Sequence, residues 1–327
     1  MKPFPRRPVS IVGPTASGKS GLAIELAKAL FPEDRCEIVS QDAYQIYRFM
    51  DIGTAKPDKS QLSGVVHHMI DVKDPWQDSS AAWFQKEIRR VMEDLSERGI
   101  RPILVGGSGL YARSAVDDLS FKPYSPLLRS RLEERLLKEG SSGLWKELEK
   151  RDPKAAEAID PRNGRRVVRA LEAVEASGSF SPSLPSYLYL FPCLQIGLDL
   201  PRGELDERIE ARVEKMRKEG LEEEVESLKG KMSKTAAQAI GYGQILDFLN
   251  GKIGREEAYG AIKTKTRRLA RRQMSWFGRD PRVHWLSADD PGLLRRALDL
   301  VRRADEGEFD LSDLGPKGPS RRPLGSV

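Results

Sequence analysis

Cysteine and histidine are scarce in this 327-residue sequence, which holds two of the former and three of the latter. Cys36 and Cys193 each stand at the start of an apolar, strand-like run, so we expect two buried thiols rather than a disulfide or a metal pair. So few histidines leave no set for a zinc finger. His67 and His68 are adjacent in a strand-like run and would face opposite sides of a strand, which favours structural roles over shared metal binding.

Long apolar runs are also missing. None approaches the roughly 18 residues of a membrane-spanning helix, and the N-terminal segment MKPFPRRPVS lacks the apolar centre of a signal peptide. We therefore expect a cytoplasmic protein that does not contact a membrane. With 39% hydrophobic and 32% charged residues, a chain of this length can bury a sizeable core and form two domains.

Acidic residues are absent from two basic stretches of a chain whose formal net charge is +6. The stretch RNGRRVVR at 162–169 has four arginines, and KTKTRRLARRQMSWFGR at 263–279 has seven basic residues. The second contains Trp276 and Phe277, and basic groups interleaved with aromatic rings suit phosphate contact and stacking on bases. A solvated helix face is the alternative interpretation of each stretch.

The most specific short motif is GPTASGKS, which lies between the strand-like PVSIV and the helical GLAIELAKAL. It matches the P-loop pattern, in which backbone N–H groups cradle phosphate oxygens, the lysine adds charge and the final hydroxyl reaches Mg²⁺ at a helix N-terminus. Glycines allow the close backbone approach that this requires. The motif predicts a diphosphate or nucleotide site made of Gly13, Pro14, Thr15, Ala16, Ser17, Gly18, Lys19 and Ser20, with Ser20 on the metal side.

Short apolar runs alternate with helical patterns along much of the chain, as in VSIVG, EIVSQD, HHMIDV, PILVGGS, LQIGLDL and VHWL. This alternation predicts an α/β fold, a P-loop NTPase-like parallel sheet with helices on both faces. Successive helical patterns and a Ser/Pro-rich linker interrupt it and predict a mostly helical insertion domain. The expected organisation is a core domain at 1–118 and 193–304, an insertion at 119–192 and a disordered tail at 305–327.

Asp42 ends the run EIVSQD, and ligands of open α/β sheets bind beyond the carboxyl ends of the strands. Tyr44 and Gln45 follow closely and could stack on a base and pair with its edge. A helix N-cap is the structural alternative for Asp42. The residues alone also allow a P-loop small-molecule kinase, with Asp42 accepting a hydroxyl proton, or a non-catalytic RNA-binding protein.

Several segments together resemble the bacterial tRNA dimethylallyltransferase family, also called tRNA isopentenyltransferases. The resemblance runs from Val9 to about Leu286 and is carried by GPTASGKS, EIVSQDAYQIYRFMDIGTAKP, HHMIDVKDP, PILVGGSGLY, RRVVRALEA, RIEARVEKM, AIGYGQ and TRRLARRQMSWF. The segments DIGTAKP and ARRQMSWF are especially specific in combination. The C-terminal zinc finger of the eukaryotic relatives is absent from the sequence.

The resemblance implies that the P-loop holds the diphosphate of dimethylallyl diphosphate. In this family the five-carbon group passes to the exocyclic amine of the adenosine 3′-adjacent to the anticodon, which gives isopentenyladenosine; the base is flipped out to be reached. We therefore expect the tRNA anticodon stem-loop and dimethylallyl diphosphate as partners, Mg²⁺ as cofactor and a monomeric protein. A relative that prenylates free adenine nucleotides is a further alternative.

The resemblance also implies residue roles. Asp42 corresponds to the general base, Ser20 to the Mg²⁺-side hydroxyl and Arg212 to a channel arginine that steadies the diphosphate. The implied tRNA contacts are Asp42, Ala43, Tyr44, Gln45, Ser108, Arg129, Arg165, Arg166, Val167, Val168 and Arg169. Two positions depart from the usual family pattern: Ala43 replaces a serine and so loses a hydroxyl beside the base, whereas Ser108 replaces a threonine and keeps the hydroxyl.

Overall fold

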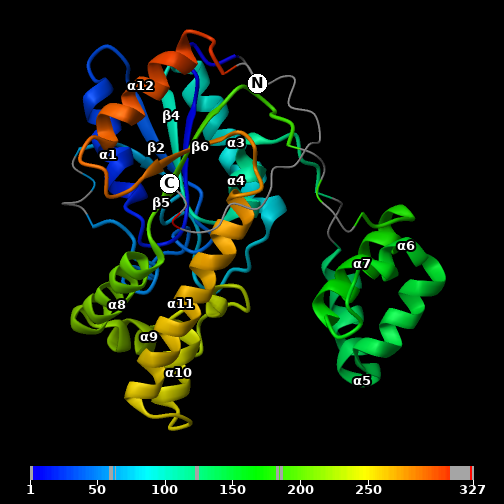
Figure 1. Cartoon of the computed structure of the whole chain (residues 1–327). Helices are drawn as coiled ribbons and strands as arrows, with labels where there is room; N and C mark the ends of the chain where they lie inside the picture. The colour runs from blue at the N-terminus through cyan, green and yellow to red at the C-terminus, as the bar shows by residue number, and fades with distance from the viewer. Residues whose placement is uncertain are drawn as a thin grey trace. The chain divides into compact units, whose positions relative to one another are not determined.

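The computed structural model describes residues 3–58, 62, 64–121, 125–181, 184, 187–309 and 325. The chain forms two compact units (Figure 1). The core unit comprises Met1–Asp118 and Tyr187–Val327, and the helical unit comprises Leu119–Ser186. The returning chain therefore rejoins the core at Tyr187, earlier than the expected boundary at residue 192. The described residues include no helix both long and apolar enough to cross a membrane.

A six-stranded parallel sheet forms the centre of the core unit and confirms the predicted fold class. Its order is β3-β2-β4-β1-β5-β6. All residues of β4, β1 and β5, which are neighbours in this order, are buried, as their apolar runs predict. The strands are β1 (Val9–Val12), β2 (Cys36–Ser40), β3 (His67–His68), β4 (Arg101–Val105), β5 (Leu194–Asp199) and β6 (Val283–Ser287).

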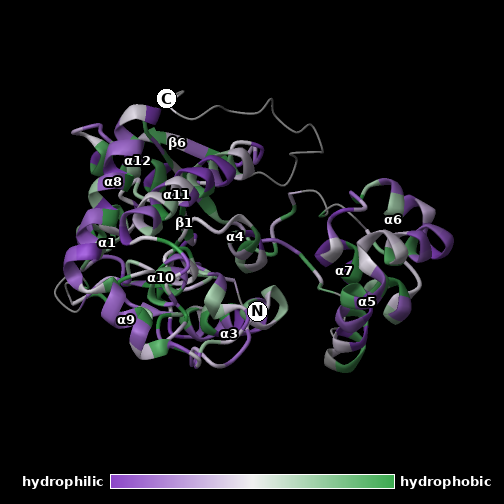
Figure 2. Cartoon of the chain, turned by 90° about the horizontal axis from the view of Figure 1, so that it is seen from below, coloured by the Kyte–Doolittle hydropathy of each residue, from purple (hydrophilic) through white to green (hydrophobic). Residues whose placement is uncertain are grey.

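Helices cover both faces of this sheet. On one face, α1 (Lys19–Leu30) and α12 (Leu293–Asp305) share a hydrophobic cluster with the strands, and on the other α3 (Ala81–Glu97) and α4 (Gly109–Val116) share a second one. Hydrophilic residues line the outer surfaces of α1 and α9 (Figure 2). The remaining core helices gather at one end of the sheet in Figure 1: α8 (Arg202–Glu219), α9 (Leu221–Leu228), η1 (Ala236–Gln238), α10 (Tyr242–Leu249) and α11 (Arg255–Phe277).

The helical unit has its own small hydrophobic core. It consists of α5 (Pro126–Arg151), α6 (Pro153–Glu157) and α7 (Gly164–Ser177), and α5 is interrupted where Gly140 adopts a φ of 74°. Apolar residues of α5 and α7 interlock in this core, among them Leu144, Leu148, Val167, Val168 and Leu171. These helices correspond to the successive helical patterns of the sequence.

Two connecting segments join the core to the helical unit side by side. Asp117 and Tyr189 form an antiparallel bridge, and the Asp118 N–H donates to the Leu188 carbonyl at 2.9 Å. Buried Arg282 fixes both segments, because its Nη1 donates to Asp117 at 2.8 Å while its guanidinium lies 4.0 Å from the Tyr189 ring centre. The exit and re-entry points of the chain are thus held together within the core.

The predicted C-terminal tail starts with residues that are structured. Asp305, the expected first tail residue, ends α12 and accepts a hydrogen bond from buried Arg101 at 2.6 Å. Residues up to Phe309 remain against the core, where the Phe309 ring lies 4.2 Å from that of His284. The rest of the predicted tail lies outside the described residues, apart from Gly325.

The two cysteines are unpaired. Cys193 is buried as predicted, whereas Cys36 is only half-buried. Burial raises the pKa of both thiols to about 12, so both stay protonated and unreactive at neutral pH.

Candidate active site

The P-loop connects β1 to α1 in a conformation that depends on its glycines. Gly13 has a φ of 139°, and a Cβ there would lie 2.5 Å from the Leu198 carbonyl oxygen of β5. Gly18 has a φ of 85° and directly precedes α1, which begins at Lys19. Ala16 is also left-handed, with a φ of 65°. The loop therefore lies against the sheet and ends at a helix N-terminus, where backbone N–H groups favour an anion.

Two cations converge on this loop, the buried Lys19 and the half-buried Arg212. The Lys19 ammonium donates to the Pro14 carbonyl at 2.5 Å, and Arg212 of α8 donates to the Thr15 hydroxyl at 3.1 Å. Burial, with a smaller contribution from Arg212, lowers the pKa of Lys19 to about 7, against the opposing charge of Asp42. Burial also lowers the pKa of Arg212. Neither cation forms a salt bridge within the described part of the chain, so an anion placed between them would replace lost hydration.

Asp42 follows β2 and caps a turn rather than a helix. Its Oδ1 accepts the backbone N–H groups of Tyr44 at 2.8 Å and Gln45 at 3.3 Å. Among the described residues, no hydrogen bond reaches Oδ2. The structural alternative is therefore half right: one carboxylate oxygen fixes the turn, and the other stays available on a residue that lines the cavity.

The side-chain amide of Gln45 is already engaged by the protein. Its Oε1 accepts from the Ser40 hydroxyl at 3.1 Å, while its Nε2 donates to the carbonyls of Ala55 at 3.2 Å and Thr54 at 3.4 Å. Gln45 thus ties the Asp42 turn to the DIGTAKP loop. Pairing with a base edge would require these hydrogen bonds to be exchanged.

Helix α11 packs its RRQMSW segment into the glycines that follow β4. A Cβ on Gly107 would lie 2.3 Å from Gln273 Nε2, and one on Gly109 would lie 2.1 Å from Trp276 Cδ1. Gln273 Oε1 in turn accepts the Thr15 backbone N–H at 2.8 Å. The RRQMSW segment and the glycines after β4 are far apart in the sequence, but they pack together as one structural unit that contacts the P-loop through Gln273. The sequence does not mark Gln273 as a site residue, because nothing in a basic stretch indicates which polar residue turns inward.

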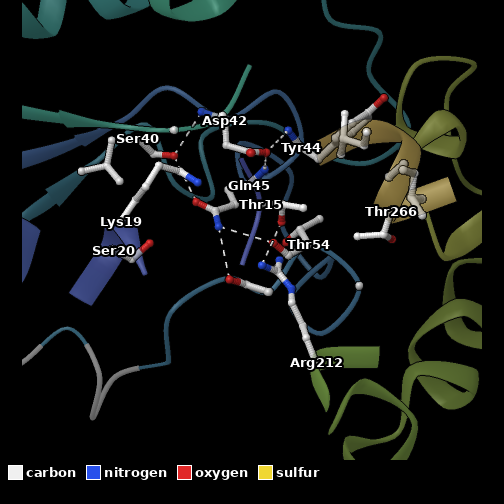
Figure 3. Close-up of a pocket in the computed structure, with 18 of the residues that line it drawn as sticks. Thr15, Lys19, Ser20, Ser40, Asp42, Tyr44, Gln45, Thr54, Arg212 and Thr266 are labelled. Atoms are coloured by element: carbon white, nitrogen blue, oxygen red, sulfur yellow. Dashed lines mark hydrogen bonds between the residues drawn. The ribbon is translucent and has the colours of Figure 1, made fainter. Parts of the chain in front are cut away.

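These elements enclose a cavity of about 260 Å³ at the carboxyl ends of the strands. Its polar end contains Lys19, Ser20, Asp42 and Arg212, which Figure 3 shows around the same space. An apolar wall from α8, α11 and the segment before α10 was not predicted; it comprises Val213, Met216, Ile240, Ile262 and Leu269. His67 also lines the cavity, with its Nδ1 2.8 Å from the Val65 carbonyl oxygen, whereas His68 pairs with Glu37 at 2.6 Å.

The donor set suits a metal ion bound mainly through a substrate. Ser20 lies in the first turn of α1, and both Ser20 and Asp42 line the cavity. The described residues contain no cluster of three or more histidine, cysteine or carboxylate side chains able to hold a metal by themselves. Mg²⁺ is characteristically held by one or two protein ligands together with phosphate oxygens and water, which fits this arrangement.

Two further predicted contact residues lie near this site. Ser108 directly follows Gly107 and occupies the N-cap position of α4 without a side-chain capping hydrogen bond. Ala43 is half-buried in the Asp42 turn. The structure therefore brings Ala43 and Ser108 into the neighbourhood of the cavity, although neither lines it.

The predicted contact segment of the helical unit divides into two kinds of residue. Arg165 and Arg166 are exposed, but Val167 and Val168 are buried in the core of the unit, so their side chains cannot contact a partner and that part of the prediction is corrected. The other two predicted contacts are ion-paired. Arg129 and Arg169 both bind the buried carboxylate of Glu172, Arg169 at 2.7 Å. This pairing leaves them less available than the sequence suggested.

The basic stretch of α11 also has two faces. One is neutralised by α8, where Lys263 pairs with Glu214 at 2.7 Å and Arg267 pairs with Glu210. The other is exposed and forms no salt bridge within the described residues; it comprises Lys265, Arg268, Arg271 and Arg272, and the exposed Arg279 follows just after the helix. The predicted stacking role of Phe277 is wrong, because its ring is 2% exposed in a hydrophobic cluster, whereas Trp276 is 36% exposed.

Comparison with known proteins places these features in a family. The IPP transferase family model matches residues 45–280. The chain is 51% identical over 324 residues to the tRNA dimethylallyltransferase of Bifidobacterium longum, covering 98% of this chain and 99% of that protein. It is 48% identical over 298 residues to the tRNA dimethylallyltransferase of Thermobifida fusca, covering 90% and 93%.

Solved structures of similar fold come from the same kind of enzyme. The tRNA isopentenylpyrophosphate transferase of Bacillus halodurans superposes with a TM-score of 0.67 at 37% identity, covering 93% of this chain and 99% of that one. A eukaryotic dimethylallyltransferase acting on tRNA superposes with a TM-score of 0.76 at 25% identity, covering 97% and 82%.

Proposed function

The chain belongs to the IPP transferase family, and from this premise we propose that it transfers a dimethylallyl group from dimethylallyl diphosphate to the exocyclic amine of an adenosine in tRNA. One observation carries the assignment of the site. The cations Lys19 and Arg212 meet the P-loop at one end of a cavity that Asp42 also lines. A leaving diphosphate and a proton acceptor are the two groups this reaction needs.

The diphosphate occupies the P-loop end in this proposal. Lys19, Arg212 and the backbone N–H groups at the start of α1 stabilise the negative charge that develops on diphosphate as the allylic carbon departs. The Ser20 hydroxyl would hold Mg²⁺, which when bound neutralises part of that charge. Because both cations are already desolvated, their interaction with the leaving group is stronger than it would be in water.

Asp42 supplies the second group that the reaction needs, a proton acceptor. The bond from the allylic carbon to the diphosphate oxygen breaks, a bond from the amine nitrogen to that carbon forms, and the amine proton passes to Asp42. Oδ1 remains on the Tyr44 and Gln45 backbone N–H groups, so the turn keeps its geometry while Oδ2 accepts the proton. A fixed base of this kind gives about 10²–10⁴-fold in rate.

The apolar wall suits the five-carbon group. Val213 and Met216 of α8 and Leu269 of α11 surround the cavity beside its polar end. They exclude water from a carbon with cation-like character, which would otherwise be captured by hydrolysis. A kinase site for a small polar substrate has no use for such a wall.

We assign tRNA binding to the exposed basic face of α11 and to Arg165 and Arg166 of the helical unit. Phosphate contacts supply most of the affinity of such surfaces and position the nucleic acid, while the reacting base enters the cavity by flipping. The family resemblance specifies the adenosine 3′-adjacent to the anticodon. Because the substrate is tRNA and one chain lines the whole cavity, we also propose a monomer that works in the cytoplasm.

One assay separates this function from its competitors. The protein is incubated with labelled dimethylallyl diphosphate and bulk tRNA, with dimethylallyl diphosphate and AMP, or with ATP and candidate hydroxyl substrates. We expect label only in tRNA, with loss of transfer in Lys19→Ala. Label in AMP would favour the free-nucleotide prenyltransferase, and ATP-dependent phosphorylation would favour the kinase.

A further inference from the structure

Glu224, on α9, gathers four hydrogen-bond donors outside the cavity. Its Oε2 accepts the backbone N–H groups of Asp51 at 2.8 Å and Ile52 at 2.7 Å, and its Oε1 accepts those of Gly53 at 3.0 Å and the Tyr242 hydroxyl at 2.6 Å. Three consecutive N–H groups that point at one carboxylate form an anion nest. Here the nest is filled by a side chain of the same protein.

We call this arrangement, in which Glu224 holds the backbone of residues 51–53, the clamp. Contacts of Tyr242 and Lys56 reinforce it. A Cβ on Gly53 would lie 2.5 Å from Tyr242 Cε2, so the loop lies directly on that ring. Burial, aided by the Glu224 charge, raises the pKa of Tyr242 further above its usual range and keeps its hydroxyl a proton donor. Beyond the nest, the buried ammonium of Lys56 donates to Asp51 at 2.5 Å and to the Tyr47 carbonyl at 2.8 Å.

The clamped loop continues into the active site. Gly53, Thr54, Ala55 and Pro57 line the cavity, whereas Glu224 does not. The Thr54 and Ala55 carbonyls hold the Gln45 amide, and the Gln45 backbone N–H in turn donates to the Asp42 carboxylate. Three sets of hydrogen bonds, joined by the backbone of the loop and by Gln45 itself, thus connect Glu224 to Asp42.

We propose that Glu224 is a positioning residue for the transfer reaction, fixing the DIGTAKP loop so that Gln45 and Asp42 are held at the amine of the target base. The inference rests on the proposed function. It separates Glu224 from the groups at the P-loop end, because within the described part of the chain the carboxylate forms no hydrogen bond to Lys19, Ser20 or Arg212. Loss of the clamp should therefore slow the chemical step and spare diphosphate binding.

The test compares Glu224→Gln with Glu226→Gln, an exposed glutamate on the same helix. Glutamine keeps the shape of Glu224 but replaces one acceptor oxygen by an amide NH2 group, which cannot accept from the backbone N–H donors. We expect single-turnover transfer at saturating substrates to fall about 10–100-fold in Glu224→Gln, in the range that small misplacement of reacting groups produces. The affinity for inorganic diphosphate should stay within twofold, and Glu226→Gln should match the wild type in both.

A purely structural role predicts a different result: a lower melting temperature with an unchanged rate per folded molecule. If Glu224→Gln does not fold, Glu224→Asp carries the test, with the charge kept and a smaller rate loss expected. A double-mutant cycle gives the second readout. Because Glu224 acts through Asp42, Glu224→Gln should cost less than threefold in an Asp42→Asn background.

Full additivity with Asp42→Asn, or a Glu224→Gln rate within twofold of the wild type, would overturn the proposal. Failure of the proposed function looks different, since the wild type itself would then transfer nothing to tRNA. In that event amide hydrogen exchange of residues 51–53 decides about the clamp alone: loss of protection in Glu224→Gln but not in Glu226→Gln supports it, and equal protection refutes it.

Discussion

Replacing Asp42 by asparagine tests the roles of its two carboxylate oxygens separately. Oδ1 caps a turn, and the proposed function assigns the amine proton to Oδ2. Asparagine retains an Oδ1 able to accept the Tyr44 and Gln45 backbone N–H groups, which Asp42 accepts at 2.8 and 3.3 Å. It presents an amide nitrogen in place of Oδ2. Because aspartate and asparagine rank together as caps, we expect only a few tenths of a kcal/mol, about the difference between them, to be lost from folding stability.

The catalytic loss should be far larger. Asparagine cannot take the amine proton, so the contribution of a general base, about 10²–10⁴-fold, disappears. This corresponds to about 2.7–5.4 kcal/mol of transition-state stabilisation. Since the lost interaction exists only in the transition state, the rate constant should fall while the Michaelis constant for dimethylallyl diphosphate stays nearly unchanged.

The assay is single-turnover transfer to tRNA below pH 7, where Lys19, with a pKa of about 7, is charged. This condition matters because the Asp42 charge raises the pKa of Lys19, and its removal would otherwise weaken the diphosphate site as well. Thermal denaturation and binding of inorganic diphosphate serve as controls. A rate within threefold of the wild type would refute the general-base assignment and leave the cap as the sole role of Asp42.

Three further predictions address other parts of the molecule. A bound diphosphate should raise the pKa of Lys19 from about 7. The dissociation constant of diphosphate should therefore grow above pH 7, by up to about tenfold per pH unit. A pH profile identical to that of the permanently charged Lys19→Arg variant would contradict this. Arg268→Gln should weaken tRNA binding and lower its salt slope by about one, whereas Lys263→Gln, paired with an α8 glutamate, should change neither in a filter-binding titration. Gly109→Ala should lower the melting temperature, since its Cβ would lie 2.1 Å from Trp276; an unchanged denaturation curve would show that the ring can move aside at no cost.

Features encoded by neighbouring residues could be predicted from the sequence. The P-loop is one, because its glycines, lysine and hydroxyl act within eight consecutive residues between a strand and a helix. The position of Asp42 is another, since every parallel strand of the sheet ends at the same edge. The fold class followed from the same alternation of strand and helix patterns.

Features that depend on which side of a helix meets a neighbour could not be predicted. Val167 and Val168 lie in a basic segment but face the core of the helical unit, and Phe277 faces a hydrophobic cluster one residue after the exposed Trp276. The engagement of Gln45 by Thr54 and Ala55 is equally invisible in a linear sequence. In each case the answer lies in a contact between segments, which residue types alone do not specify.

The paired segments at the base of the helical unit make that unit exchangeable. Because Asp117 and Tyr189 are bridged and Arg282 holds both, the two ends to be rejoined are already adjacent in the core. A short turn in place of residues 119–186 would close the chain without disturbing the sheet or the P-loop. The same geometry allows the inserted helices to be lengthened or replaced while the sheet and the P-loop stay intact, so the two units can diversify at separate rates.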